Sequence, residues 1–143
     1  MHYFILEVVE SGYKFHFDTV PEVAALTQNE SATKNSDFVW KAIRELLCSE
    51  RIREVPQPPV VTKPLSVSVQ ANGKKQLILD LRYVNKHLVK HHFKYEDLKT
   101  GLAHFERGRY MFLFDLKSVY HHIKIHPFNQ QFLGFSWACP STG

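Results

Sequence analysis

The sequence has little of what marks a disulfide-stapled, zinc-binding or membrane-spanning protein. Its two cysteines, Cys48 and Cys139, stand far apart and form no C-x-x-C pair, so they give no disulfide or zinc framework. The apolar N-terminus lacks a basic segment and is interrupted by Glu7 and Glu10, so it predicts neither a signal peptide nor a membrane span. We therefore expect an intracellular location, in the cytoplasm or the nucleus, and no contact with a membrane.

Low-complexity tracts and internal repeats are also absent, whereas material for a core is plentiful. Hydrophobic residues make up 44% and aromatic residues 13% of the 143 positions, which is typical of one globular domain or part of a larger one. Residues 1–72 carry seven Lys/Arg against nine Asp/Glu, but residues 73–143 carry eleven against five. The basic half favours a polyanionic partner such as nucleic acid, although an ordinary solvated surface explains the same charge.

The first half of the chain predicts a lead-in, a helix and a hairpin. Residues 1–35 hold short apolar pieces and a polar run, and we expect them to be extended and loop-rich. From Ser36 an amphipathic helix is predicted, whose inner face holds Phe38, Val39, Ala42, Ile43, Leu46 and Leu47. After a proline-rich connector, residues 65–69 and 75–81 flank an Asn-Gly turn, which predicts a β-hairpin.

The second half predicts a helix followed by short strands. Glu96 and Asp97 are expected to open a helix that ends at Gly108, with Leu98, Leu102 and Phe105 on its inner face. The apolar run Tyr110 to Phe114 predicts a buried strand, and a turn at 117–121, a strand at 123–125, a break at Pro127 and a strand at 132–137 should follow. Helices and strands alternate without a regular βαβ period, so the predicted class is α+β.

Two clusters of polar residues are candidates for chemistry. Asp115 follows the predicted buried strand, where a rigidly held carboxylate suits a metal or phosphoryl-transfer site, although a turn or cap role is the alternative. Lys74 and Lys75 stand at the hairpin tip, where they could clamp phosphates or only protect an edge strand. A transition-metal site of Asp115 with His121, His122 and His126 is a further alternative, but Ile123 to Ile125 alternates like a strand and disfavours helical ligand spacing.

Two motifs in this order resemble the fingers and first catalytic motif of reverse transcriptases. They are Leu-Asp-Leu-Arg-Tyr-Val-Asn-Lys at 79–86 and Phe-Asp-Leu-Lys-Ser-Val-Tyr-His-His-Ile at 114–123. The chain is most similar to retrotransposon enzymes of the DIRS type, with gypsy-like elements next, from about Phe38 onward. The resemblance implies an incomplete right-hand polymerase, in which residues 36–143 form a partial reverse transcriptase domain, fingers plus the start of the palm.

The resemblance also implies roles for individual residues. Asp115 would bind catalytic Mg²⁺, and Leu116 would offer its backbone carbonyl to the second ion. The remaining nucleotide contacts would come from Lys74, Lys75, Lys117, Ser118, Val119 and Tyr120, with the tyrosine as the gate beneath the sugar. Structural support of the fingers would come from Asp80, Arg82 and Asn85. The implied partners are an RNA or DNA template-primer, a deoxynucleoside triphosphate, and the remaining palm, thumb and RNase H or recombinase modules of a parent polyprotein.

Three departures from the family pattern bear on activity. Gln76 stands where an arginine usually contacts the triphosphate, and Val119 stands where glycine usually precedes the gate tyrosine. The Y-x-D-D motif that supplies further catalytic carboxylates is absent from this sequence. We therefore expect a fragment of an RNA-directed DNA polymerase that does not polymerise alone, and the alternative is a degenerate, non-catalytic nucleic-acid-binding remnant.

Overall fold

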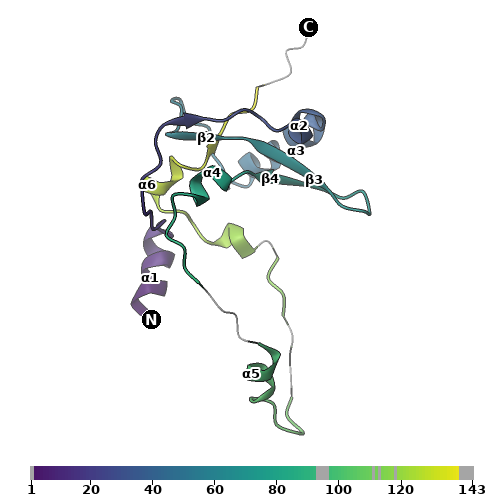
Figure 1. The fold of residues 1–143 in the computed structure, drawn as a ribbon. Helices are drawn as coiled ribbons and strands as arrows, with labels where there is room; N and C mark the ends of the chain where they lie inside the picture. The colour runs from purple at the N-terminus through teal and green to yellow at the C-terminus, as the bar shows by residue number, and fades with distance from the viewer. Residues whose placement is uncertain (1, 93–96, 111, 113, 118, 139–143) are drawn as a thin grey trace.

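The computed structural model describes residues 2–92, 97–110, 112, 114–117 and 119–138, and these form an α+β arrangement (Figure 1). The predicted class is thereby confirmed, while the polymerase architecture stays a prediction. In chain order the elements are α1 (His2–Ser11), β1 (Ala24–Ala25), α2 (Glu30–Thr33), α3 (Ser36–Cys48), β2 (Val61–Lys63), β3 (Leu65–Val69), β4 (Lys75–Leu79), α4 (Arg82–Asn85), α5 (Leu98–Leu102), the 3₁₀ helix η1 (Val119–His122), α6 (Pro127–Gln130) and β5 (Gly134–Phe135).

Two small sheets organise the body of the molecule. The strands β1, β2 and β5 run parallel in the order β1-β2-β5, with Ala24 beside Val61 and Thr62 beside Gly134. The hairpin β3–β4 is antiparallel, and its register pairs Leu65 with Leu79. Within the described part of the chain, no helix is long and apolar enough to cross a membrane.

The larger core lies between α2, α3 and the hairpin. Alternate residues of β3 and one face of α3 supply it, because periods of two and of about 3.6 residues each gather apolar side chains on one side. Its buried members are Ala32, Val39, Ile43, Leu65 and Val67. The predicted helix and its inner face are confirmed, since all six of its apolar positions are buried or half-buried.

A smaller core lies on the parallel sheet. Val61 of β2, Val84 of α4 and Phe132 are buried together. The ring of Phe17 packs edge-on against Phe132, with a centroid distance of 4.9 Å. Residues from four distant parts of the sequence therefore meet here, which joins the N-terminal third to the C-terminal end of the described chain.

Residues 1–35 are more structured than the sequence predicts. They contain the ten-residue helix α1, the strand β1 and the helix α2, whose Ala32 is fully buried. The sequence does not predict α1, because the apolar residues of this helix lie on almost every side of it and leave no amphipathic period. The division of the chain at residue 35 into a lead-in and a domain stays a prediction.

The predicted hairpin is confirmed, but the helix that the sequence predicts from Glu96 and Asp97 to Gly108 is shorter than expected. α5 ends at Leu102 instead of near Gly108, and Leu102 and Phe105 of its predicted inner face are more than half exposed. Asp97 is its N-cap and accepts a hydrogen bond from the Thr100 N–H at 2.9 Å. Figure 1 shows α5 at the lower end of the molecule, away from both sheets. Glu96 lies outside the described residues.

The prediction of a buried strand before Asp115 is wrong for the described residues. Tyr110, Phe112 and Phe114 are in irregular backbone and are 105%, 89% and 70% exposed, while residues 111 and 113 lie outside the described set. A buried strand needs hydrogen-bonding neighbours, and no described strand pairs with this run. The apolar sequence is strand-like, but its burial depends on partners that the described part of the chain does not provide.

The C-terminal elements also differ from those that the sequence predicts. Pro127 begins α6 instead of only breaking the chain, because the first position of a helix needs no backbone N–H donor. Ile125 makes a single parallel bridge to Tyr13, and the predicted strand at 132–137 is reduced to Gly134–Phe135. Of the turn predicted at 117–121, residues 119–121 belong to η1, and residue 118 lies outside the described set.

Candidate nucleotide-binding site

The hairpin tip presents two lysines on a tight, exposed turn. The Gly73 N–H donates to the Gln70 carbonyl at 2.8 Å, and the Gln70 N–H donates to the Lys74 carbonyl at 2.9 Å. Gly73 has a φ of +79°, a conformation that glycine adopts without steric cost. Lys74 and Lys75 are exposed, and neither makes an ion pair with a described residue. Their ammonium groups are therefore available to an anion.

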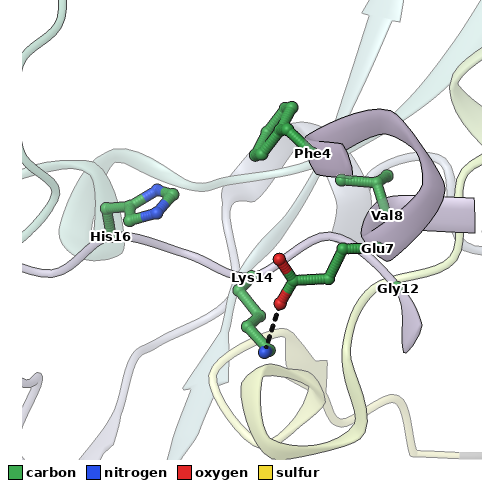
Figure 2. A pocket seen from close by; sticks show the side chains of 6 residues that line it. All are labelled: Phe4, Glu7, Val8, Gly12, Lys14 and His16. Atoms are coloured by element: carbon green, nitrogen blue, oxygen red, sulfur yellow. Dashed lines mark hydrogen bonds and ion pairs between the residues drawn. The ribbon is translucent and has the colours of Figure 1, made fainter. Parts of the chain in front are cut away.

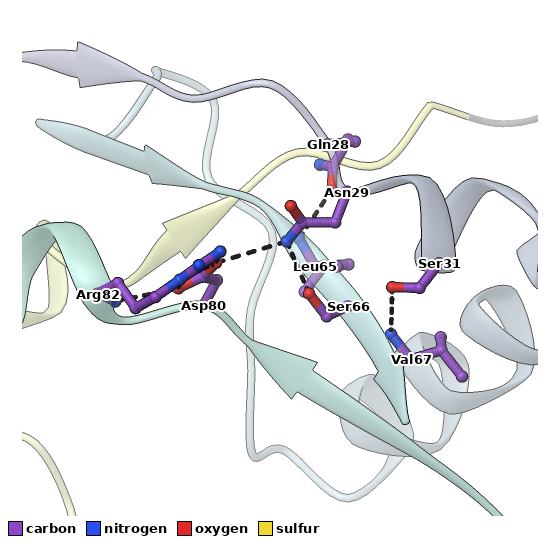
Figure 3. Close-up of polar contacts among 8 residues, drawn as sticks. All are labelled: Gln28, Asn29, Ser31, Leu65, Ser66, Val67, Asp80 and Arg82. Atoms are coloured by element: carbon purple, nitrogen blue, oxygen red, sulfur yellow. Dashed lines mark hydrogen bonds and ion pairs between the residues drawn. The ribbon is translucent and has the colours of Figure 1, made fainter. Parts of the chain in front are cut away.

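A carboxylate fixes the base of the hairpin. The Asp80 side chain, 11% exposed, accepts the Arg82 backbone N–H at 3.0 Å and the Arg82 Nε–H at 3.0 Å, and Arg82 Nη2 lies 2.5 Å from its Oδ2 (Figure 3). These hydrogen bonds from Arg82 hold the pKa of Asp80 far below its usual range. The bracing role implied for Asp80 and Arg82 is consistent with this geometry, although the Arg82 side chain is itself 81% exposed. Asn85 is exposed, and its side chain makes no hydrogen bond with a described residue.

Side chains before and within α2 close the other edge of β3, and sequence reasoning missed them. The N–H groups of Leu65 and Val67 donate to Gln28 Oε1 at 2.8 Å and Ser31 Oγ at 3.2 Å (Figure 3). Asn29 Nδ2 donates to Ser66 Oγ at 2.6 Å. An edge strand exposes unpaired backbone groups, and Gln28 and Ser31 satisfy two of them on β3. The sequence predicts a loop for this polar run, and its signal for these contacts is the presence of two amides and a hydroxyl within four residues, Gln28, Asn29 and Ser31.

The residues around Asp115 form a second, separate group. Asp115 is exposed in irregular backbone, and Val119 and Tyr120 lie on η1, with Tyr120 88% exposed. The Lys117 carbonyl lies 3.2 Å from His122 Nε2, and Leu116 is 59% exposed. Ser118 lies outside the described residues.

The two groups are not brought together in this structure. Among the described residues, no hydrogen bond or ion pair connects residues 115–122 to the hairpin. In Figure 1 the tip of the β3–β4 hairpin points away from η1, the light-green turn that follows α5. The structure thus places the tip lysines and Asp115 on two surfaces, and their convergence on one nucleotide stays a prediction.

Metal ligands are likewise not assembled within the described ranges. No group of three or more His, Cys, Asp or Glu residues there is close enough to hold a metal ion. His126, one of the histidines in the alternative metal site, instead accepts the Phe128 N–H through Nδ1 at 3.2 Å and caps α6. Asp115 is one carboxylate, and a two-metal centre needs more. The described residues therefore do not by themselves fit a complete magnesium centre.

A small pocket lies beside α1 (Figure 2). Phe4, Val8, Gly12 and His16 line it together with the ion pair of Glu7 and Lys14, whose Oε1 and Nζ are 2.7 Å apart. The hydrogen bond from Lys14 lowers the pKa of Glu7. Because the two charges neutralise each other, the pocket offers an incoming ion no uncompensated partner.

Comparisons with known proteins do not extend these observations. No family model matches the chain, and no curated protein matches it.

Proposed function

We propose that this chain forms the fingers and the first catalytic segment of an RNA-directed DNA polymerase, whose complete form performs magnesium-dependent nucleotidyl transfer. The observation that carries the proposal is the β3–β4 hairpin, which has two lysines at an exposed tip and a base held by Asp80. A rigid arm ending in cations suits the triphosphate of a nucleotide, because charge-assisted contacts with phosphate oxygens are strong. The two sequence motifs then assign Asp115 and Tyr120 to the same nucleotide.

The activity belongs to a polypeptide that also carries a Y-x-D-D motif, which this sequence lacks. Such a motif would add the carboxylates that the described residues do not supply. The bound metal ions would then stabilise charge on the transferred phosphoryl group. Within this chain, the lysines of the tip would bind phosphate oxygens, and Tyr120 would lie under the sugar.

Primer extension on an RNA template tests the polymerase assignment. The enzyme would be a chain that continues through a Y-x-D-D motif, and Asp115→Ala should lower its rate at least about 1,000-fold, as expected when a catalytic electrostatic contact is removed. Asp37→Ala removes another exposed acid, on α3, and should leave the rate unchanged. Full activity of the Asp115 variant would sink the assignment.

A non-catalytic nucleic-acid-binding remnant is the second candidate, and the basic second half favours it. Binding of a labelled single-stranded oligonucleotide, followed by fluorescence anisotropy, should weaken steeply as salt increases, because each phosphate contact releases counterions. The double variant Lys74→Gln/Lys75→Gln should reduce the salt slope by about one to two.

The matched control is Lys41→Gln/Arg44→Gln, which removes two exposed charges from α3. It should keep the slope of the wild type. Equal losses in both variants would show that binding follows net charge and not the hairpin tip. Absence of binding at low salt would remove the remnant hypothesis.

A further inference from the structure

Lys63 is a fully buried lysine in the middle strand of the parallel sheet. Its exposure is 0%, and its Nζ atom makes no hydrogen bond with any described residue. It points to the same side of β2 as Val61, because the residues at alternate positions of a strand share a face. Lysines are almost never fully buried unless they are paired, so the lack of a partner requires an explanation.

The nearest explanation is the carboxylate of Asp80. The Asp80 N–H donates to the carbonyl of Pro64 at 3.0 Å, which holds Asp80 against the residue that follows Lys63. Among the described residues, the negative charge of Asp80 raises the pKa of Lys63, against the larger lowering by burial. However, both oxygens of Asp80 already accept hydrogen bonds from Arg82.

An ion pair with the Asp80 carboxylate stabilises the buried Lys63 more than it stabilises the exposed Arg82. The Arg82 side chain is 81% exposed, so water can replace its ion pair at little cost. The Lys63 side chain is shielded from solvent, and a buried charge without a partner is destabilising. If the Asp80 carboxylate exchanges the exposed guanidinium for the buried ammonium, the stabilisation gained at Lys63 therefore offsets much of the free energy lost at Arg82.

We propose that Lys63 and Arg82 are alternative partners of Asp80, so that a phosphate-like anion capturing the Arg82 guanidinium releases the carboxylate to pair with Lys63. The switch acts at the junction of β2, β3, β4 and α4, and it does not depend on the polymerase assignment. Linkage makes the coupling reciprocal: protonation of Lys63 strengthens anion binding at Arg82, and anion binding favours protonated Lys63.

The proton equilibrium of Lys63 provides the readout. Burial lowers its pKa from 10.5 to about 8, although Asp80 raises it. The neighbouring strands β1 and β5 contain no ionisable side chain, and α4 with the residue pair after it brings Arg82, Tyr83, Lys86 and His87. Between pH 8 and 10.5 the unfolded chain binds more protons at this lysine than the folded chain, so the stability of the fold increases with pH.

Urea unfolding from pH 7 to 10.5 tests the switch in the wild type, Lys63→Met and Arg82→Gln. The full pKa difference corresponds to a limiting increase of about 300-fold in the folding equilibrium constant of the wild type, of which roughly half is reached by pH 10.5, relative to Lys63→Met as the baseline for all other groups. Arg82→Gln frees Asp80 for Lys63, so this increase should shrink at least tenfold. An undiminished increase in Arg82→Gln would overturn the proposal.

Arg109→Gln is the matched control, since it removes another exposed arginine from an ion pair, with Glu106. It should behave as the wild type. If Lys63→Met does not fold, the ¹³Cε chemical shift of Lys63 gives its midpoint directly, near pH 8 in the wild type and higher in Arg82→Gln. Equal midpoints would again contradict the exchange.

The anion step is tested with inorganic phosphate against chloride at equal ionic strength. Phosphate should raise the Lys63 midpoint in the wild type and leave Arg82→Gln unchanged. A wild-type Lys63 midpoint that does not change when phosphate is added, or an equal change of the midpoint in both proteins, would refute anion binding at Arg82 as the trigger.

Discussion

At the scale of single residues, one glycine fixes the exit of α1. Gly12 has a φ of +89°, and its N–H donates to the Val8 carbonyl at 3.0 Å. A Cβ atom at this position would lie 2.7 Å from the backbone nitrogen of His126. The chain can therefore leave the helix and pair Tyr13 with Ile125 only where no side chain intervenes.

Gly12→Ala should lower the free energy of unfolding by about 1–3 kcal/mol, because it adds both left-handed strain and a clash with backbone. Urea denaturation measures the loss. The control is Gly101→Ala in α5, where a Cβ would meet nothing within 4 Å and should favour the helix by about 0.5–1 kcal/mol. Similar effects at both sites would show that close approach at Gly12 is not limiting.

Single residues also show what sequence can and cannot reveal. The ion pair of Asp80 and Arg82 is local, since a single residue separates the partners, and the resemblance of the motif implied a bracing role for both. The burial of Lys63 was not predictable, because it depends on β1 and β5, which lie about 40 residues before it and 70 after it. A lysine between Val-Thr and proline normally indicates a solvated strand end.

At the scale of elements, the helix and hairpin predicted from local periodicity and turn residues are confirmed, whereas the strand predicted from an apolar run is not present among the described residues. The helix α3 and the hairpin β3–β4 follow from periodicity and a turn signal within fewer than 20 residues each. The run from Tyr110 to Phe114 has an equally strong strand composition, yet its described residues are exposed. Composition indicates what an element prefers, whereas its burial depends on which other elements reach it.

This contrast predicts different responses to substitution. The double variant Phe112→Ser/Phe114→Ser should change the free energy of unfolding by less than about 1 kcal/mol, because both rings are already largely solvated. Phe132→Ala should cost about 3–5 kcal/mol, since Phe132 is 2% exposed in the smaller core. Thermal or urea unfolding of the three proteins gives the comparison. A large loss in the Phe112 and Phe114 variant would mean that this run is buried in solution.

At the scale of the whole molecule, the described chain exposes much apolar surface in two places. One is α1, and the other is the segment around Tyr110 to Leu116. The exposed apolar side chains of α1 are Tyr3, Phe4, Ile5, Leu6 and Val9. Soluble monomers rarely expose such continuous patches, so the chain should associate as its concentration increases.

Sedimentation velocity over a concentration series tests this expectation. The average mass of the wild type should increase with concentration, and Tyr3→Ser/Val9→Ser should reduce the increase, because it removes the two most exposed apolar side chains of α1. Val20→Ser/Val23→Ser is the control, since these exposed valines lie outside any helix or strand. A concentration-independent mass for the wild type would contradict the prediction.

The strand order β1-β2-β5 also sets the sequence of events during synthesis. The hairpin pairs residues at most 14 positions apart, such as Leu65 and Leu79, and can close early. The parallel sheet must wait for Gly134 and Phe135, which pair with Thr62 and Lys63. On the ribosome the buried lysine therefore stays solvated until the last described strand emerges, and closure of this sheet is a late, slow step of folding.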